Sequence, residues 1–289
     1  MRISYLHYTP KEIPPTHFYY YGWGKGLSGH DVTEKNCTLE SLKESDGDYD
    51  LCFVSPGFVE LGKHLYKKKS RTKYILVLEE DMHQGIETLK CVADYYDYVF
   101  LFSEINFFSM RQAGVKNVRC MLPCYDPNVF SSFEVEKKFS VAFLGQFDYL
   151  FNIRGSTRRE YCEELEIHFN QKAFIGKGFY AESANEIYND SIIALDLPIM
   201  SVVGPRSFCI GATSAVLMLP LNRGTFQWEN NFKAGEDYIT FNDIEDLKRV
   251  IHEYTEKPHK CLEISKSMNE KMKGHTYKKR FEEILSIIM

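Results

Sequence analysis

Short apolar runs alternate along the whole chain with segments in which apolar residues recur every three or four positions. This alternation is typical of parallel α/β structure. In the first half, strands are predicted over residues 2–8, 31–36, 49–54, 73–78, 98–102 and 117–122. The segments between them predict helices over residues 19–27 and 104–113.

A change of pattern near residue 130 separates the chain into two halves. Pro123, Asp126, Pro127 and Asn128 interrupt regular structure, and residues 131–138 are mostly polar, so we interpret this segment as a linker. The pattern then restarts, with predicted strands over residues 139–144, 173–175, 192–197, 215–219 and 238–241. Helices are predicted over residues 157–170, 183–189, 205–213, 244–254, 258–273 and 277–288.

We therefore predict two Rossmann-like domains, over residues 1–130 and 131–275, and a final helix, 276–289, that packs back toward the first domain. Ligands of open α/β sheets bind beyond the carboxyl ends of the strands. Two such domains facing each other across a cleft would bring two substrates together.

Composition and charge narrow the classes of function. The chain has 289 residues, 44% of them hydrophobic and 15% aromatic, which is enough apolar surface to exclude a disordered protein. A net charge of -5 argues against a dedicated nucleic-acid binder, which usually carries a basic face. The only dense basic run, Lys67-Lys68-Lys69-Ser70-Arg71, is interpreted first as a solvated loop.

The spacing of the cysteines and the lack of a recognisable signal peptide predict a cytoplasmic protein. The 8 cysteines include no CxxC pair, which excludes the spacing of zinc knuckles and thioredoxin-like sites. Several, such as Cys52, lie in apolar runs and are interpreted as core thiols. The chain opens as a strand, without the apolar stretch of a signal peptide, and no apolar run reaches the roughly 20 residues of a membrane span.

Motifs of the second half carry a resemblance to a known family. They occur in the order Tyr188-Asn-Asp-Ser191-Ile-Ile-Ala-Leu195-Asp, Pro205-Arg206-Ser-Phe208, Phe232-Lys-Ala-Gly235-Glu236 and Gly274-His275-Thr276-Tyr277-Lys-Lys-Arg280. This series resembles the CgeB-like branch of the GT-B glycosyltransferases. The first half agrees more loosely, for example at Gly29-His30-Asp31-Val32, so the resemblance covers nearly the whole chain.

The resemblance implies an α/β fold of the GT-B type, with the N-terminal domain on the acceptor side and the second domain binding a nucleotide sugar. It implies a glycosyltransferase of the hexosyl type that uses a nucleoside-diphosphate sugar, with a UDP-sugar as the first choice. The acceptor is an unidentified hydroxyl of a glycan, a protein, a small molecule or a modified DNA base, so nucleic acid enters only as an acceptor. Retention of configuration and independence of metals and other cofactors are also implied.

The segment Gly204-Pro205-Arg206-Ser207 is the leading candidate for the diphosphate of the donor. A helix N-terminus offers free N–H groups and a favourable dipole, proline suits the first turn, and an arginine can bind phosphate with two hydrogen bonds. Charge that develops on a leaving diphosphate needs such fixed donors, which makes Arg206 a catalytic candidate. An ordinary helix start with a surface arginine is the alternative.

Further donor-binding candidates rest on the resemblance, and their alternatives are structural. Arg158 is chosen among Arg154, Arg158 and Arg159, and Tyr188 would serve equally well as a buried tyrosine of the core. The glycines of the Gly22-Trp23-Gly24 segment could admit a phosphate, but a plain turn explains them as well. The remaining candidates are Gly145, Gly176, Lys177, Ser191, Ser207, Phe208 and Cys209.

Two further features concern catalysis. Asp81 and His83 follow a predicted strand of the first domain and are candidates for binding the acceptor hydroxyl or the sugar, with a solvated loop as the alternative. Acidic pairs such as Asp46 and Asp48 lie in a predicted turn, so no metal site is predicted.

One departure from the family pattern matters for activity. Retaining members have a glutamate where this chain has Cys209, and a thiol accepts only weak hydrogen bonds. Either the sugar is held differently, or another acid such as Glu229 or Glu236 replaces the glutamate. The alternative function is therefore an inactive GT-B module that binds nucleotide or glycan.

Overall fold

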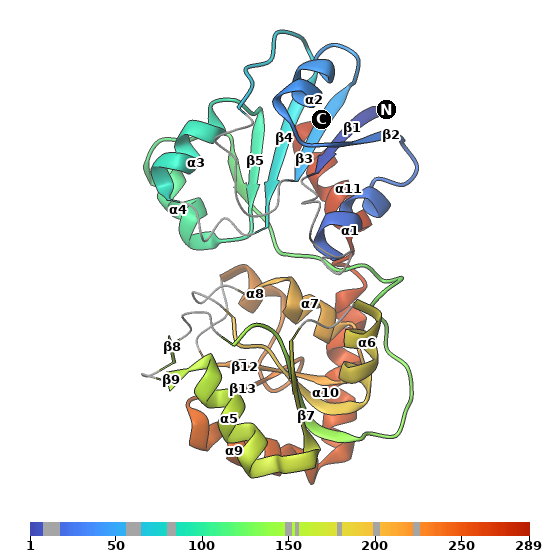
Figure 1. Cartoon of the computed structure of the whole chain (residues 1–289), viewed down its shortest axis with the longest axis vertical. Coiled ribbons are helices and arrows are strands. Elements are labelled where there is room, and N and C mark those ends of the chain that lie inside the picture. Colours follow the sequence, from blue (N-terminus) through green and yellow to red (C-terminus); the bar gives the residue numbers. More distant parts are fainter. Residues whose placement is uncertain are drawn as a thin grey trace. The chain divides into compact units, whose positions relative to one another are not determined.

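The computed structural model describes residues 1–7, 18–55, 65–79, 85–147, 152–153, 156–177, 181–198, 203–221 and 226–289. The chain divides into two compact units (Figure 1). Unit 1 comprises Met1–Leu122 and Tyr277–Met289, and unit 2 comprises Pro123–Thr276. The boundary thus lies after Leu122, earlier than the predicted position at residue 130, and the final helix belongs to unit 1.

Unit 1 contains a parallel sheet in the order β2-β1-β3-β4-β5-β6 over its described residues. Its inner strands β3 and β4 are buried almost throughout, as expected for a sheet covered on both faces. Every strand predicted in this half is present. The bounds are β1 (Arg2–His7), β2 (Asp31–Asn36), β3 (Leu51–Ser55), β4 (Lys73–Leu78), β5 (Tyr98–Leu101) and β6 (Val118–Cys120).

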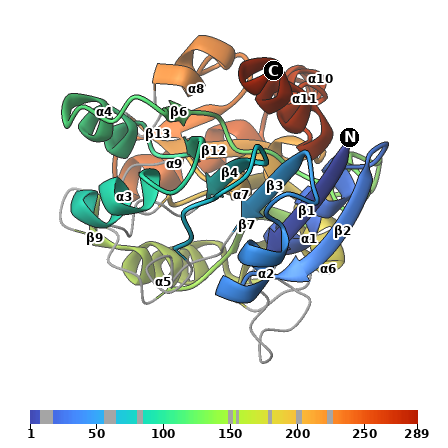
Figure 2. The same cartoon turned by 90° about the horizontal axis from the view of Figure 1, so that it is seen from above.

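Two packed pairs among the described helices of unit 1 matter for the fold. Helices α3 and α4 lie side by side in both views (Figures 1 and 2). Helix α11 packs on α1, where the rings of Trp23 and Tyr277 meet edge to face at 5.1 Å. The bounds are α1 (Phe18–Gly26), α2 (Leu39–Glu44), α3 (Ile86–Ala93), α4 (Glu104–Gln112) and α11 (Tyr277–Ile288).

Unit 2 contains a second parallel sheet in the order β10-β7-β11-β12-β13 among the residues described. A short antiparallel pair, β8 (Asn152–Ile153) and β9 (Ser156–Thr157), follows β7 in the chain. Every strand predicted in this half is present as well. The bounds are β7 (Phe139–Leu144), β10 (Ala173–Gly176), β11 (Ser191–Leu195), β12 (Val216–Pro220) and β13 (Ile239–Phe241).

The helices of unit 2 bury a continuous apolar core. Leu165 of α5 and Leu247 and Ile251 of α9 pack with Val141 and Ile193 of the sheet in one cluster. Helices α6 and α7 contact each other and the strands β11 and β12, respectively. The bounds are α5 (Arg158–Phe169), the 3-10 turn η3 (Asn170–Lys172), α6 (Ala181–Asn189), α7 (Pro205–Gly211), α8 (Phe226–Asn231), α9 (Ile244–Thr255) and α10 (Pro258–Met272).

The polar segment 131–138, interpreted above as a linker, is attached to unit 2 by hydrogen bonds. The amide of Asn189 donates to the carbonyl of Ser131 at 2.9 Å, and its oxygen accepts from the backbone N–H of Phe133 at 3.3 Å. The ammonium of Lys137 donates to the carbonyl of Asn189 at 2.7 Å and to the hydroxyl of Ser214 at 2.8 Å. The polar residues of this segment therefore join it to α6 rather than leave it free.

No helix in the part of the chain that the structure describes combines the length and the apolar character that crossing a membrane requires.

Candidate functional site

The carboxyl edge of the unit 2 sheet brings several predicted residues together. Because β7, β11 and β12 run parallel, the residues that follow them meet at one edge. Gly145 follows β7, Asp196 follows β11, and Arg206 and Ser207 lie in the first turn of α7. We call Gly145, Asp196, Arg206 and Ser207 the Asp196 cluster.

Asp196 holds both polar side chains of the first turn of α7. The Nη1 of Arg206 donates to Oδ1 of Asp196 at 3.0 Å, and the hydroxyl of Ser207 donates to Oδ2 at 2.6 Å. The carboxylate is only 2% exposed, whereas the side chain of Arg206 is 26% exposed. A buried carboxylate is costly unless charged or polar donors satisfy it, and here both oxygens have donors. The pair thus fixes the direction of a guanidinium that a ligand can still reach.

Gly145 and Phe143 surround the other side of the guanidinium. The Cζ of Arg206 lies 5.6 Å from the centre of the Phe143 ring, within the range of a cation–π contact. A Cβ atom at Gly145 would lie 2.9 Å from Nη2 of Arg206 and 3.1 Å from the Phe143 ring. A larger residue at this position would therefore push the guanidinium away. The predicted donor-site role of Gly145 remains a prediction, but its closeness to Arg206 is a feature of the fold.

Tyr188 and Cys209 are buried beside the cluster. Burial raises the pKa of the Tyr188 phenol, with Arg206 acting in the opposite direction. Burial also raises the pKa of the Cys209 thiol well above its ordinary value, against the opposing effect of Arg206. Both side chains are consequently neutral near pH 7, and neither brings a charge to the site.

Arg158 is almost completely buried, so little of its side chain is open to a ligand. It is 1% exposed, its Nη1 donates to the carbonyl of Gln146 at 2.7 Å, and its Nη2 donates to the carbonyl of Leu197. These carbonyls belong to the segments that follow β7 and β11, so Arg158 ties the two segments together. Of the two other arginines considered, Arg159 is exposed and Arg154 lies outside the described residues.

The other unit 2 candidates are spread over the fold. The carbonyl of Gly176 accepts from the backbone N–H of Gly145 at 2.9 Å, which places it at the same edge. Lys177 is exposed, with its ammonium 5.9 Å from the Phe147 ring. Ser191, by contrast, is at the amino end of β11, where its hydroxyl donates to the carbonyl of Ile187 at 2.7 Å.

Phe208 belongs to an aromatic cluster of the core. It is fully buried, and its ring meets those of Trp228, Phe232 and His275 at 5.5–6.1 Å. The two glutamates considered as replacements for the missing family glutamate, Glu229 and Glu236, are both exposed.

Asp196 is the acid that the sequence reasoning overlooked, although it stands in the quoted motif. It lies close enough to Cys209 to raise the pKa of that thiol further. The signal in the sequence that could have identified Asp196 was its position as a single acidic residue directly after the apolar strand Ser191–Leu195.

In unit 1, the glycines proposed for phosphate binding have packing partners. A Cβ atom at Gly22 would lie 2.1 Å from the Tyr277 ring, and one at Gly24 would lie 2.2 Å from the carboxylate of Glu34. Both glycines stand inside α1. Their small size thus allows α1 to approach α11 and β2 closely, which supports a structural role.

The catalytic candidates of unit 1, Asp81 and His83, lie outside the described residues. Just before them, Glu79 is buried and accepts a hydrogen bond from the indole N–H of Trp23. Burial raises the pKa of the nearby Tyr5, and the charges of Glu79 and Glu34 raise it further. Glu79 is a second buried acid directly after an apolar strand.

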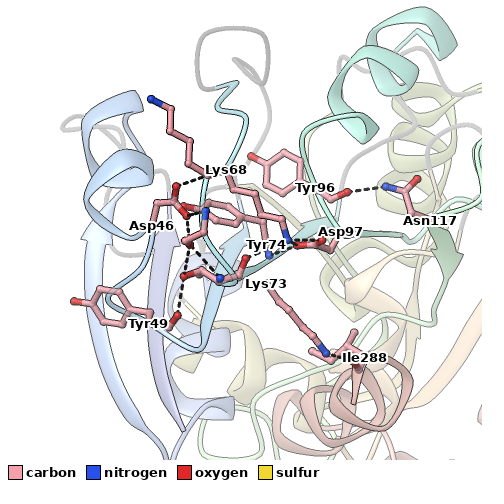
Figure 3. Close-up of polar contacts among 12 residues, drawn as sticks. Asp46, Tyr49, Lys68, Lys73, Tyr74, Tyr96, Asp97, Asn117 and Ile288 are labelled. Atoms are coloured by element: carbon pink, nitrogen blue, oxygen red, sulfur yellow. Dashed lines mark hydrogen bonds and ion pairs between the residues drawn. The ribbon is translucent and has the colours of Figure 1, made fainter.

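The basic run of unit 1 is anchored to two aspartates (Figure 3). The ammonium of Lys68 pairs with Asp97, and the backbone N–H groups of Lys69 and Ser70 donate to Asp46 at 2.6 and 3.1 Å. Burial alone would raise the pKa of Asp46, but these hydrogen bonds and those from the hydroxyls of Ser70 and Tyr66 hold it below its ordinary value. The run precedes β4 and so lies at the amino edge of the sheet.

Metal ligation was not predicted, and the described residues contain no group of three or more histidine, cysteine, aspartate or glutamate side chains placed to hold one ion.

Comparison with known proteins gives one family match. The model of a family described as glycosyl transferase-like matches residues 137–286. No curated protein matches the chain.

Several solved structures share the fold. An α-glucosyltransferase in complex with UDP and a 13-mer DNA superposes with a TM-score of 0.72 at 12% identity, over 100% of this chain and 99% of that one. Sucrose-phosphate synthase of Thermosynechococcus elongatus gives 0.68 at 10% identity, over 99% and 98%. The Anabaena protein HepE in complex with UDP gives 0.65 at 10% identity, over 100% of both chains. The predicted GT-B fold class is confirmed, and the CgeB-like branch stays a prediction.

Proposed function

Because the chain belongs to the glycosyl transferase-like family, we propose that it transfers a sugar from a nucleoside-diphosphate sugar to a hydroxyl-bearing acceptor. The observation that carries this proposal is Arg206, a partly exposed cation whose direction is set by the buried Asp196. A cation held in this way at the carboxyl edge of an open sheet suits an anionic ligand.

The chemistry explains why a positioned arginine is useful. When the bond between the anomeric carbon and the diphosphate breaks, negative charge grows on the departing oxygen. A donor that is already oriented stabilises this charge without reorganising during the reaction. Asp196 and the ring of Phe143 restrict the guanidinium of Arg206 before any donor binds. Leaving-group stabilisation by Arg206 is therefore the proposed catalytic contribution of unit 2.

Three finer features of the reaction are also proposed. We favour a UDP-sugar as donor, and the UDP in the HepE and α-glucosyltransferase complexes supports this choice. Transfer is also proposed to be metal-independent, with the positive charge of Arg206 stabilising the departing diphosphate. Retention of configuration is proposed from the resemblance of the motifs to retaining enzymes.

The acceptor is proposed to be a hydroxyl of a glycan, a protein, a small molecule or a modified DNA base. The α-glucosyltransferase structure contains DNA, but a nucleic-acid acceptor calls for a basic surface beside the site. In the dense basic run Lys67–Arg71, the ammonium of Lys68 is paired with Asp97, which lowers the positive charge that this run offers to a DNA backbone.

The alternative, an inactive module that binds the nucleotide or a glycan, is favoured by Cys209. Its buried neutral thiol cannot replace the charge-assisted hydrogen bonds of a carboxylate to sugar hydroxyls.

A two-step experiment tests the proposal. UDP-, GDP-, ADP- and dTDP-sugars are screened for thermal stabilisation of the native protein, and release of nucleoside diphosphate is then measured with the best donor. Arg206→Ala should lower turnover by about 10²-fold or more, whereas Arg159→Ala, an exposed arginine in the first turn of α5, serves as the control. Binding without turnover would establish the inactive module. Full activity of Arg206→Ala would remove Arg206 from the mechanism.

A further inference from the structure

Helices α5 and α9 of unit 2 carry matched side-chain pairs one turn apart. The ammonium of Lys248 on α9 lies 3.1 Å from the carboxylate of Glu164 on α5. One turn later along both helices, the Nε2 atoms of His168 and His252 lie 2.7 Å apart. The residue numbers rise together, so the two helices run parallel, side by side (Figure 1).

The two imidazoles are accessible but not loosely placed. Both are exposed, and the ring of Phe169, which is 9% exposed, lies beneath them. The ring centre of Phe169 is 4.8 Å from that of His168 and 5.0 Å from that of His252. The two histidine rings meet nearly at right angles, at 77°. A buried aromatic ring thus supports two exposed histidines whose Nε2 atoms face one another.

This geometry is close to that of two ligands on one metal ion. In the hydrogen-bonded form, one Nε2 carries a proton and donates a hydrogen bond, and the other Nε2 accepts that hydrogen bond. If both rings carry their proton on Nδ1, the two Nε2 lone pairs converge. Zinc–nitrogen bonds of about 2.0–2.1 Å in a tetrahedral site place two such nitrogens about 3.3 Å apart. The exposed rings would need to separate by only about 0.6 Å to admit the ion.

We propose that His168 and His252 form a bidentate site for a divalent transition ion such as Zn²⁺, Ni²⁺ or Cu²⁺, the ions that imidazole ligands suit. Because the described residues offer no third histidine, cysteine or acidic ligand, water completes the coordination. The bound ion would join the ends of α5 and α9 and stabilise unit 2.

The site is separate from the proposed sugar-transfer site. Helices α5 and α9 start where β9 and β13 lead into them and extend away, so His168 and His252 lie near their C-terminal ends. Lys172, just after α5, reaches the carbonyl of Lys138 ahead of β7, which marks the amino edge of the sheet. The Asp196 cluster lies at the carboxyl edge. Metal binding and sugar transfer can therefore fail independently.

Calorimetric titration of the tag-free protein with ZnCl₂ tests the proposal. A Cys91→Ser background removes an exposed thiol that could compete for zinc. We expect one ion per chain, and His168→Ala or His252→Ala should weaken binding at least about tenfold. His259→Ala, an exposed histidine at the start of α10, is the matched control and should bind as the parent does. Both substitutions are at exposed positions, and circular dichroism verifies that the variants fold.

Electron paramagnetic resonance with Cu²⁺ supplies a second readout. Hyperfine structure from two imidazole nitrogens should appear in the parent protein, and should fall to one nitrogen or disappear in His252→Ala. Zinc affinity that is unchanged by both alanine substitutions, or no binding to the parent chain, would overturn the proposal.

Discussion

Two buried carboxylates, one in each unit, directly follow a strand of their sheet but hold different partners. Asp196 directly follows β11 in unit 2, and Glu79 directly follows β4 in unit 1. Asp196 binds Arg206, a cation that is 26% exposed, whereas Glu79 accepts from the fully buried indole of Trp23. An acid whose cationic partner remains accessible can orient that partner for a ligand. An acid that binds a buried neutral partner instead joins two elements of the core, here α1 and the end of β4.

The largest effect that we expect from removing either of these carboxylates is on catalysis. Asp196→Ala removes the acceptor of Arg206, so the guanidinium loses its fixed direction, and turnover should fall by about 10²-fold. The measurement is kcat of the folded variant with the best donor, alongside its thermal stability. Asp190→Ala, which removes the partner of Lys138 at the amino edge, is the control and should leave kcat within about twofold. Loss of stability alone, with kcat retained, would mean that Asp196 only supports the fold.

The corresponding change in unit 1 should affect stability instead. Glu79→Ala leaves the buried indole N–H of Trp23 without its acceptor, which should cost about 1–3 kcal/mol in the free energy of unfolding. Glu79→Gln keeps an acceptor oxygen and should cost less. Chemical denaturation measures both variants, and thermal shift measures whether the donor still binds. An unchanged unfolding free energy of Glu79→Ala, or lost donor binding in both variants, would contradict the assigned structural role.

Gly145→Ala tests the role of the Arg206 position without removing any polar group. The added Cβ would lie 2.9 Å from Nη2 of Arg206, so the guanidinium must shift by a few tenths of an ångström. We expect turnover to fall by about tenfold while thermal stability changes little. Gly85→Ala is the control, because a Cβ there meets no atom of the described residues within 4 Å. Equal turnover of the two variants would show that the close contact at Gly145 does not matter for the reaction.

The smallest expected effect concerns the pH dependence of stability at a partly buried lysine. Lys137 of unit 2 donates to neutral oxygens, and burial lowers its pKa to about 8. The unfolded chain, with an ordinary lysine pKa near 10.4, therefore binds more protons than the folded chain between about pH 8 and 10.4. The stability contributed at this site should rise with pH across that window.

Comparison of the wild type with Lys137→Met isolates this effect from the tyrosines and cysteines that titrate in the same range. The difference in unfolding free energy between the two proteins should shift in favour of the wild type from pH 8 to pH 10. Identical pH slopes would show that Lys137 keeps an ordinary pKa in the folded protein.

Much of the secondary structure could be predicted because strands of a covered parallel sheet are apolar along their whole length. The predicted ranges 73–78 and 139–144 coincide with the mostly apolar strands β4 and β7. The range 31–36 coincides with β2, a polar and largely exposed strand at the edge of its sheet. The helices α2, α3 and α8 were missed. They are six to eight residues long, and helices of this length depend on caps and tertiary packing more than on their own periodicity. Thr38 and Ser41, for example, form the capping box of α2.

The residues of the candidate site were likewise predicted only in part. Arg206 and Ser207 were predicted from their place at a helix start, and the structure puts them together with Gly145 and beside Tyr188 and Cys209. Asp196 was missed. Gly22 and Gly24, predicted to bind the donor with a plain turn as the alternative, lie close to Tyr277 and Glu34 in the fold, and their donor-binding role stays a prediction. A glycine motif shows that space is needed and leaves open what fills it.

By itself, the sequence determined the succession of strands and helices, the α/β class and the presence of two similar halves, because apolar periodicity is a local property of the chain. Only the tertiary structure decided the sheet order, the attachment of segment 131–138 to unit 2 and the partners of Asp196 and Glu79. Trp23 and Glu79 are 56 positions apart, and His168 and His252 are 84 apart. Contacts over such separations follow from how parallel strands are ordered in the sheet, which no local pattern encodes.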